Sequence, residues 1–295
     1  MDRVKRLALV SIAVGLGVLA LKYAAYHITG SVALYSDALE SIVNVAAAVA
    51  ALLAIRLSAK PPDRNHPYGH YKAEYFAAVF EGVLICLAAL SIFGKAWLTF
   101  REPAVITSPI EGIVINAVAT VINAVWCWVL LKQGRRYRSP ALVADGQHLL
   151  ADVFSSAGVA AGLILAVATG WFFLDPILAV LVALNILWMG WRLVRASIGG
   201  LMDEAPPAEV LDRIRDLVSR YAAGAIEAHD LRARTSGRVT FIDFHLVVSG
   251  EMSVAEAHEI CDSIEAELKR ELGPAVVSIH VEPEDKAKHS GIVVL

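Results

Sequence analysis

The chain is organised around the segment Tyr35-Ser36-Asp37-Ala38-Leu39-Glu40-Ser41-Ile42-Val43-Asn44-Val45, which recurs as Val143-Ala144-Asp145-Gly146-Gln147-His148-Leu149-Leu150-Ala151-Asp152-Val153. In both copies an Asp is followed by polar side chains three and seven positions later, inside a strongly apolar segment. On a helix these two later positions are one turn apart, so Glu40 shares a face with Asn44, as His148 does with Asp152. The repeat predicts one four-ligand ion site built by two helices.

The composition is that of a polytopic membrane protein. Apolar residues make up 57% of the chain and charged residues only 19%, and the mean hydropathy is +0.59. A net charge of −3 gives no indication of a nucleic-acid partner. The three cysteines, Cys86, Cys127 and Cys261, are isolated, so the sequence predicts neither a disulfide framework nor a zinc finger.

Six segments are long enough to cross a bilayer, which takes roughly 20 apolar residues each. We expect these spans at residues 7–28, 31–57, 73–100, 109–131, 141–169 and 176–198. Lys and Arg collect before the first span and in the loops around residues 56–72, 132–138 and 192–195, whereas the opposite loops hold only Arg101. This bias predicts cytoplasmic N- and C-termini. We expect a transmembrane domain over residues 1–202, in an inner (plasma) membrane of the bacterial type.

Residues 203–285 have the periodicities of a small soluble domain. Residues 207–223 predict an amphipathic helix, 226–234 and 238–248 two strands around a Ser236-Gly237 turn, 253–272 a second helix, and 276–281 a last strand. Ser253 and Glu256 form a capping-box pattern at the start of the second helix. The order αββαβ predicts a cytoplasmic α+β domain of the metallochaperone or ferredoxin-like type, with both helices on one sheet face. We expect the tail, residues 286–295, to be disordered.

The intramembrane polar residues have two interpretations. They could simply hold the bundle together by hydrogen bonds, or they could bind a substrate ion. Ionisable groups cost at least ~2.5 kcal/mol near the bilayer centre, so a repeated set favours function. On this interpretation Glu40, Asn44, His148 and Asp152 supply three oxygens and one nitrogen to a divalent cation. Asp37 and Asp145 lie about a turn away, and we expect them to support the ligands or to gate access.

Two further groups could bind metal. In the loop after the second span, Asp63, His66 and His70 can converge on one ion, although a solvated loop with ordinary histidines would look the same. The soluble domain carries the larger group, which surface histidines could also produce: His229, His245, His258, His280 and Glu282. His280 and Glu282 alternate in a strand and so share a face. No HExxH sequence is present, so a zinc protease is not supported.

The chain resembles the cation diffusion facilitator family of metal-ion/proton antiporters over nearly its whole length. The resemblance rests on the six spans, the polar pairs of the second and fifth, the loop pattern Asp-x-x-His-x-Tyr-Gly-His-x-Lys-Ala-Glu, Gly200-Leu201-Met202-Asp203, and the histidine-bearing αββαβ domain. It implies a transport site, a loop site and a cytoplasmic site made of the residues named above. It also implies a homodimer, and a charged pair, Lys72 with Asp203, that links bundle and domain.

The resemblance implies proton-coupled export of a divalent cation and no enzymatic activity. Zinc-selective members usually carry His or Asp and then Asp in the second span, where this chain has Glu40 and Asn44. An oxygen-rich set with one nitrogen favours Mn²⁺ or Fe²⁺, with Zn²⁺ or Cd²⁺ as the alternative. His148 is the best proton-coupling candidate because imidazole titrates near neutral pH. A membrane-anchored metal sensor is the second alternative. The sequence leaves open whether Asn44 binds the metal or shapes the site.

Overall fold

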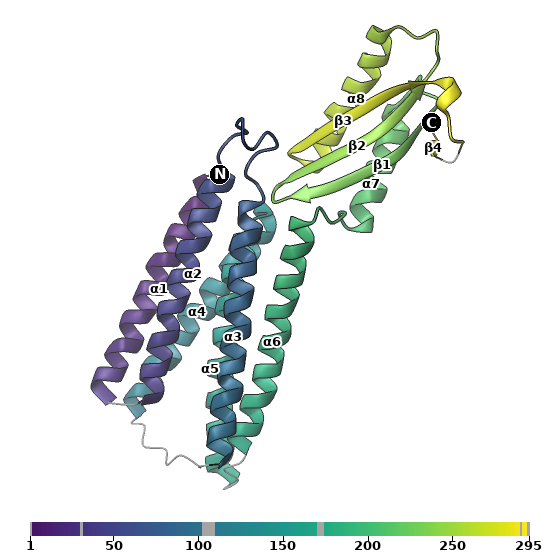
Figure 1. The fold of residues 1–295 in the computed structure, drawn as a ribbon. Coiled ribbons are helices and arrows are strands. Elements are labelled where there is room, and N and C mark those ends of the chain that lie inside the picture. The colour runs from purple at the N-terminus through teal and green to yellow at the C-terminus, as the bar shows by residue number, and fades with distance from the viewer. Residues whose placement is uncertain (1, 30–31, 102–109, 170–173, 290, 294–295) are drawn as a thin grey trace. The chain divides into compact units, whose positions relative to one another are not determined.

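The computed structural model describes residues 2–29, 32–101, 110–169, 174–289 and 291–293, and the chain divides into two units, residues 1–198 and 199–295. The described residues form six long helices in the first unit, at the positions expected from the apolar segments (Figure 1). Their bounds are α1 Asp2–Thr29, α2 Val32–Ser58, α3 Ala73–Arg101, α4 Ile110–Tyr137, α5 Pro140–Thr169 and α6 Leu174–Leu201. Their ends lie within a few residues of the predicted spans.

Five of these helices are long and apolar enough, over their described residues, to cross a membrane: α1, α2, α3, α4 and α6. Helix α5 is 30 residues long but contains Asp145, His148 and Asp152. Large apolar side chains such as Trp97, Trp128 and Trp188 are exposed on the bundle, as expected for surfaces that face lipid. The predicted fold class is confirmed.

Helix α5 holds the bundle together because two separate apolar clusters share it. One joins α5 to α1, α2 and α4 through residues such as Ala51, Leu130 and Leu142. The other joins α5 to α3 and α6 through residues such as Ala78, Ala144 and Ile186. Small alanines let helix backbones approach closely in a bilayer. The polar face of α5 therefore lies inside the bundle, where the four-ligand hypothesis requires it.

Helices α3 and α6 contact each other closely at two glycines. A Cβ on Gly82 would lie 2.7 Å from Val194 Cγ2, and one on Gly190 would lie 2.8 Å from Cys86 Sγ. Only glycine fits such a contact without displacing a neighbouring side chain or backbone. Gly82 directly follows Glu81, so this close contact lies beside Glu81 on α3.

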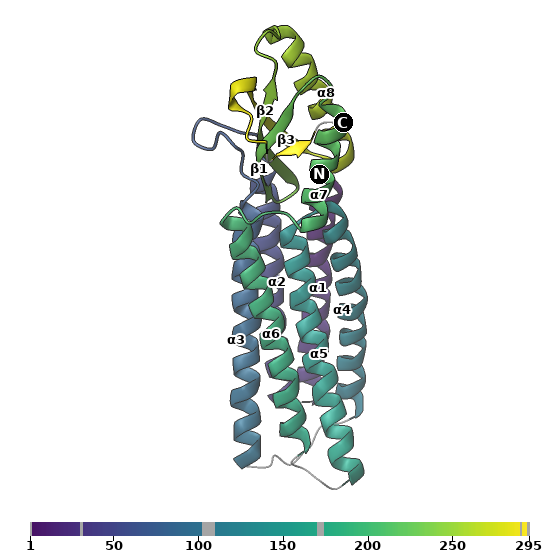
Figure 2. The ribbon, with the colours of Figure 1, turned by 90° about the vertical axis from the view of Figure 1, so that its right-hand side faces the viewer.

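The second unit has the predicted αββαβ order: α7 Ala208–Tyr221, β1 Glu227–Ser236, β2 Val239–Val248, α8 Val254–Leu272 and β3 Ala275–Pro283. The sheet order is β3-β2-β1-β4, with β2 antiparallel to β1 and parallel to β3. Figures 1 and 2 show α7 and α8 together on one face of the sheet. Residues such as Ile214, Phe244 and Ile264 are buried between the layers. The predicted capping box of Ser253 and Glu256 opens α8.

The end of the chain differs from the disordered tail expected from the sequence. A 3-10 turn, η1 Glu284–Lys286, leads to a short strand, β4 Ile292–Val293, which pairs antiparallel with Glu227 and Ala228 of β1. The carboxylate of Glu227 also accepts hydrogen bonds from the backbone N–H groups of Lys288 (2.9 Å) and His289 (2.8 Å). These contacts order the described part of the tail. The composition of the tail itself does not predict them, because they are made with a distant strand.

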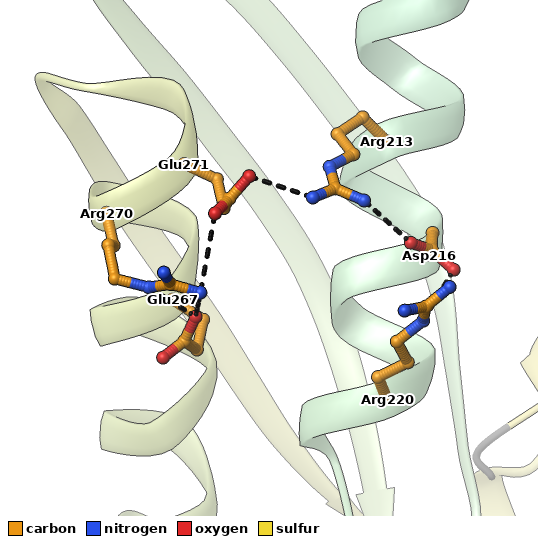
Figure 3. A network of polar contacts seen from close by, with 6 residues as sticks. All are labelled: Arg213, Asp216, Arg220, Glu267, Arg270 and Glu271. Atoms are coloured by element: carbon orange, nitrogen blue, oxygen red, sulfur yellow. Dashed lines mark hydrogen bonds and ion pairs between the residues drawn. The ribbon is translucent and has the colours of Figure 1, made fainter.

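Charged side chains join the outer faces of the two domain helices (Figure 3). Arg213 of α7 reaches Glu271 of α8 at 2.8 Å and Asp216 of its own helix at 3.1 Å. Arg220 continues the network from Asp216, and Arg270 continues it from Glu271. The guanidinium of Arg213, through its hydrogen bond, lowers the pKa of Glu271. Exposed pairs of this kind are screened by solvent, so the network supports the packing of α7 on α8 rather than determining it.

Candidate functional site

Three of the four predicted transport-site residues meet inside the bundle. Asn44 of α2 and His148 and Asp152 of α5 are all buried, at 5%, 4% and 6% exposure. Asn44 Oδ1 lies 2.6 Å from His148 Nε2, and Asn44 Nδ2 donates a hydrogen bond to Asp152 Oδ2. The spacing of four residues on α5 places both side chains on the face that meets α2. The amide of Asn44 therefore bridges the two α5 residues.

These hydrogen bonds fix one protonation pattern for the cluster without metal. Because an amide oxygen only accepts, His148 donates from Nε2, and its Nδ1 is then a bare nitrogen. That Nδ1 is buried and has no hydrogen-bond partner among the described residues. Asp152 accepts from Asn44, as an ionised carboxylate does. A cation bound between these atoms would take the place of the hydrogen bonds, with the imidazole proton moved to Nδ1 or released.

The fourth predicted ligand, Glu40, lies in α2 one turn before Asn44, and Asp37 lies further toward the start of that helix. The side chains of both residues fall outside the described part of the structure, so their roles remain predictions. Asp145 is described, and it is 2% exposed. It accepts a hydrogen bond from Ser11 Oγ at 2.5 Å, and Trp126 Nε1 donates to that hydroxyl at 3.0 Å. Asp145 is thus held by α1 and α4.

The loop between α2 and α3 brings together the three residues predicted there. Ligand atoms of Asp63, His66 and His70 all lie within 4.8 Å of one another. Asp63 Oδ1 is 3.4 Å from His66 Nδ1, and Asp63 Oδ2 is 3.4 Å from His70 Nε2. The backbone N–H of His66 lowers the pKa of Asp63, which keeps the carboxylate ionised. One carboxylate and two imidazoles at this spacing suit a divalent metal.

The strand register of the second unit aligns three histidines across the sheet. His229 of β1 pairs with His245 of β2, which pairs with His280 of β3. Their ring centroids are 5.3 Å and 4.9 Å apart. Glu282 reaches all three rings, with oxygen–nitrogen distances of 3.3, 3.1 and 3.6 Å. Four of the five residues predicted for the cytoplasmic site therefore lie together on the sheet face opposite the helices.

The fifth predicted residue, His258, lies apart from this row. It is on α8, next to Ala257, which packs into the core on the other face of the sheet. Its exposed ring lies 3.8 Å from Asp262 on the same helix. The sheet itself separates His258 from His229, His245 and His280, so one copy of the domain does not join all five.

Sequence reasoning missed Asp230 next to the histidine row. Ligand atoms of His229, Asp230 and His245 lie within 4.8 Å of one another. The pairing of β1 with β2 is irregular between His229 and Arg232, and Asp230 has a left-handed φ of 53°. This bulge brings Asp230 toward its neighbours, contrary to simple strand alternation. Lys288 Nζ pairs with Asp230 at 2.6 Å, and its hydrogen bond lowers the pKa of that carboxyl.

Three buried charged residues of the bundle were also missed. Lys22 of α1 is 2% exposed, Glu74 of α3 is 8% exposed, and Glu81 of α3 is fully buried. Glu74 accepts hydrogen bonds from Ser58 (2.7 Å) and from Ser139. The only signal in the sequence was an isolated charge within, or at the edge of, an apolar span. No repeat marked these residues, so they were not singled out.

The predicted pair of Lys72 and Asp203 joins residues of the two different units and stays a prediction. Within the second unit, Asp203 Oδ1 forms an ion pair with Arg234 Nη1 at 2.9 Å. The same guanidinium lies 4.3 Å from the centroid of the Phe241 ring.

Comparison with known proteins assigns both units. Residues 8–202 match the cation efflux transmembrane domain, and residues 206–284 match the cation efflux protein cytoplasmic domain. The transporter sll1263 of Synechocystis sp. is 40% identical over 281 residues, covering 95% of this chain and 91% of that protein. The cation-efflux pump FieF of Escherichia coli is 31% identical over 284 residues, covering 95% and 93%.

A solved structure of CzrB in its Zn form is 44% identical and covers 29% of this chain and 98% of its own, with a TM-score of 0.28. The two domain matches together span almost the entire chain, and the alignments cover more than nine-tenths of both relatives. The chain therefore belongs to the cation diffusion facilitator family and is a membrane-spanning transporter of divalent metal cations, not an enzyme.

Proposed function

We propose that this protein exports Mn²⁺ or Fe²⁺ from the cytoplasm in exchange for protons by alternating access. The observation that carries the proposal is the contact of Asn44 with both His148 and Asp152 across two helices. A carboxylate, an amide oxygen and one imidazole form a set richer in oxygen than in nitrogen. Such sets suit Mn²⁺ and Fe²⁺ better than sets with two histidines do.

Proton coupling follows from competition at the same atoms. The metal needs an ionised Asp152 and a free nitrogen on His148, so each bound cation excludes protons from those groups. The hydrogen bond of His148 Nε2 to Asn44 occupies that nitrogen in the metal-free cluster. A metal on Nε2 of a neutral His148 sends that proton to the free Nδ1, so this step alone releases no proton. A proton is exchanged where the metal-free site has bound an additional one, on Asp152 or on the second nitrogen of His148, which the next metal displaces. Alternation of the bundle between two open states would convert this exchange into antiport.

The metal clusters outside the bundle have a different role in this proposal. Asp63, His66 and the row of His229, His245 and His280 lie outside the membrane spans. They would sense cytoplasmic metal and stabilise a homodimer rather than carry ions. We place the protein in an inner (plasma) membrane of the bacterial type with both termini in the cytoplasm, because Lys and Arg collect on that side.

The test is metal uptake by the purified protein in proteoliposomes with an imposed proton gradient. Mn²⁺, Fe²⁺, Zn²⁺ and Cd²⁺ are compared for the wild type and for Asn44→Asp, with protein-free liposomes as the control. We expect the wild type to move Mn²⁺ and Fe²⁺, and the substitution to admit Zn²⁺. Wild-type preference for Zn²⁺ would refute the selectivity argument and leave metal transport standing. Absence of any uptake would favour the metal-sensor alternative.

A further inference from the structure

A fully buried carboxyl that the transport site does not use lies in the middle of the bundle. Glu81 of α3 has 0% exposure, and neither of its carboxyl oxygens has a hydrogen-bond partner among the described residues. Its neighbours one turn away on either side, Ala78 and Ile85, belong to the apolar cluster that joins α3 to α5 and α6. A leucine would suit such a position better. Buried polar groups without a partner are rare in native structures, and each requires an explanation.

The charged groups around Glu81 offer no compensating cation. Helix α5, which packs against α3, presents Asp145 and His148 on its buried face. Ala144, the residue before Asp145, lies in the same apolar cluster as Ala78 and Ile85, so Asp145 is close to Glu81. On α2, the described side chains of residues 41–58 include one charged group, Arg56, which is exposed. On α6, Arg192 and Arg195 are exposed as well. Among the described residues, the charged group that acts on Glu81 is therefore another acid, Asp145.

An ionised Glu81 is not compatible with this environment. A bare carboxylate in an apolar interior loses its hydration without replacement, and a second carboxylate nearby adds repulsion. Asp145 accepts a hydrogen bond from Ser11, which stabilises its ionised form. No described residue donates such a hydrogen bond to Glu81, so of the two acids it is Glu81 that must be neutral. Glu81 therefore carries a proton.

The position of Glu81 along the bundle connects this proton to the transport site. Glu74 and Glu81 are seven residues apart on α3, which places them roughly 10 Å apart along the helix axis. Glu74 accepts a hydrogen bond from Ser139, the residue before α5 begins. Glu81 lies close to Asp145, which is one turn before His148 on α5. The Glu81–Asp145 layer thus lies between the N-terminal end of α5 and the ligands Asn44, His148 and Asp152.

We propose that Glu81, paired with Asp145, is a second proton-binding site of the transporter, separate from the metal ligands. The proton on Glu81 is released when the bundle rearranges and exposes this layer to water, and it is taken up again when the layer closes. Glu81 would thereby carry a proton that does not compete directly with the metal. This inference rests on the proposed antiport function.

The first experiment measures protons and metal together in proteoliposomes, with an entrapped pH dye and a metal-sensitive dye. In Glu81→Gln the amide mimics the neutral carboxyl, so we expect metal to move while the number of protons per cation falls by about one. The matched control is Glu74→Gln, whose position has hydroxyl partners on both sides, and its ratio is expected to equal that of the wild type. A wild-type ratio in Glu81→Gln, together with wild-type uptake, overturns the inference.

Two further outcomes separate this inference from the proposed function. Metal uptake by the wild type without any proton movement would remove the antiport mechanism itself. If Glu81→Gln fails to insert, dicyclohexylcarbodiimide tests the wild type directly. This apolar reagent adds a protonated carboxyl across a C=N bond to give an O-acylisourea, which rearranges by an oxygen-to-nitrogen acyl shift to a stable N-acylurea. We expect mass spectrometry to find several-fold more labelling at Glu81 than at Glu74. Labelling of Glu81 no greater than that of Glu74 overturns the inference.

Discussion

Replacing Asp152 by Asn should weaken metal binding at the intramembrane site by about three orders of magnitude. The substitution keeps the size of the side chain and removes its charge. Asp152 is 6% exposed and accepts a hydrogen bond from Asn44. An Asn at this position can still offer its oxygen to Asn44, so the local packing is retained while the anionic ligand is lost.

The magnitude follows from the burial of the site. Two unit charges 4 Å apart interact by about 4 kcal/mol at the effective dielectric constant of about 20 that suits protein sites. A divalent cation doubles that attraction, and the cost of desolvating the carboxylate takes part of it back. A net loss of about 4 kcal/mol remains, which raises the Kd about a thousandfold.

The assay combines calorimetric titration of the purified protein with initial uptake rates in proteoliposomes. Both are done in a His245→Ala, His280→Ala background, so that metal bound at the sheet does not contribute to the titration. Asn185→Leu is the control, because Asn185 is an exposed polar residue of α6 within the same bundle. It should leave both the Kd and the uptake rate unchanged. A Kd in Asp152→Asn equal to that of the background protein would show that Asp152 is not a ligand.

Three other predictions test the surroundings of the sites. Lys288→Met removes the ammonium that pairs with Asp230 and should tighten metal binding at the histidine row only slightly, because an exposed pair is screened by solvent; weaker binding in titration would contradict this. Glu74→Ala leaves the buried Ser139 hydroxyl without its acceptor, whereas Ser58 can still donate to the Ile55 carbonyl at 3.1 Å, and should destabilise the bundle by about 1–3 kcal/mol, seen as a lower Tm in detergent; an unchanged Tm would refute it. The tail should detach only in acid. Burial alone would raise the pKa of Glu227, but hydrogen bonds from two tail amides lower it below the ordinary value of 4.5. The stabilisation is therefore complete above pH 4.5 and is lost as the pH falls through the lower folded value, which NMR of those amides would follow; loss of the contact near neutral pH would contradict the assignment.

Local sequence patterns were sufficient for the architecture. Apolar runs of membrane-crossing length predicted the bundle, and the change to amphipathic and alternating patterns after residue 203 predicted the αββαβ domain. The capping box of Ser253 and Glu256 located the start of α8 to the residue. Each of these features depends on interactions within a few positions of the chain. The tail was missed because its order depends on Glu227, about sixty residues earlier.

The ligand positions on each helix were also a property of the sequence, because a spacing of four residues puts Asn44 with Glu40, and Asp152 with His148, on one helical face. Only the tertiary structure decided which faces meet. Packing of alanines sets the register of α2 and α3 against α5, which brings Asn44 to His148 and leaves Glu81 without a hydrogen-bond partner among the described residues. Strand pairing aligns His229, His245 and His280, and the helix layer excludes His258. The sequence by itself determined the ligand types and their local spacing, whereas the contacts between distant segments depend on packing and strand register, which no local pattern encodes.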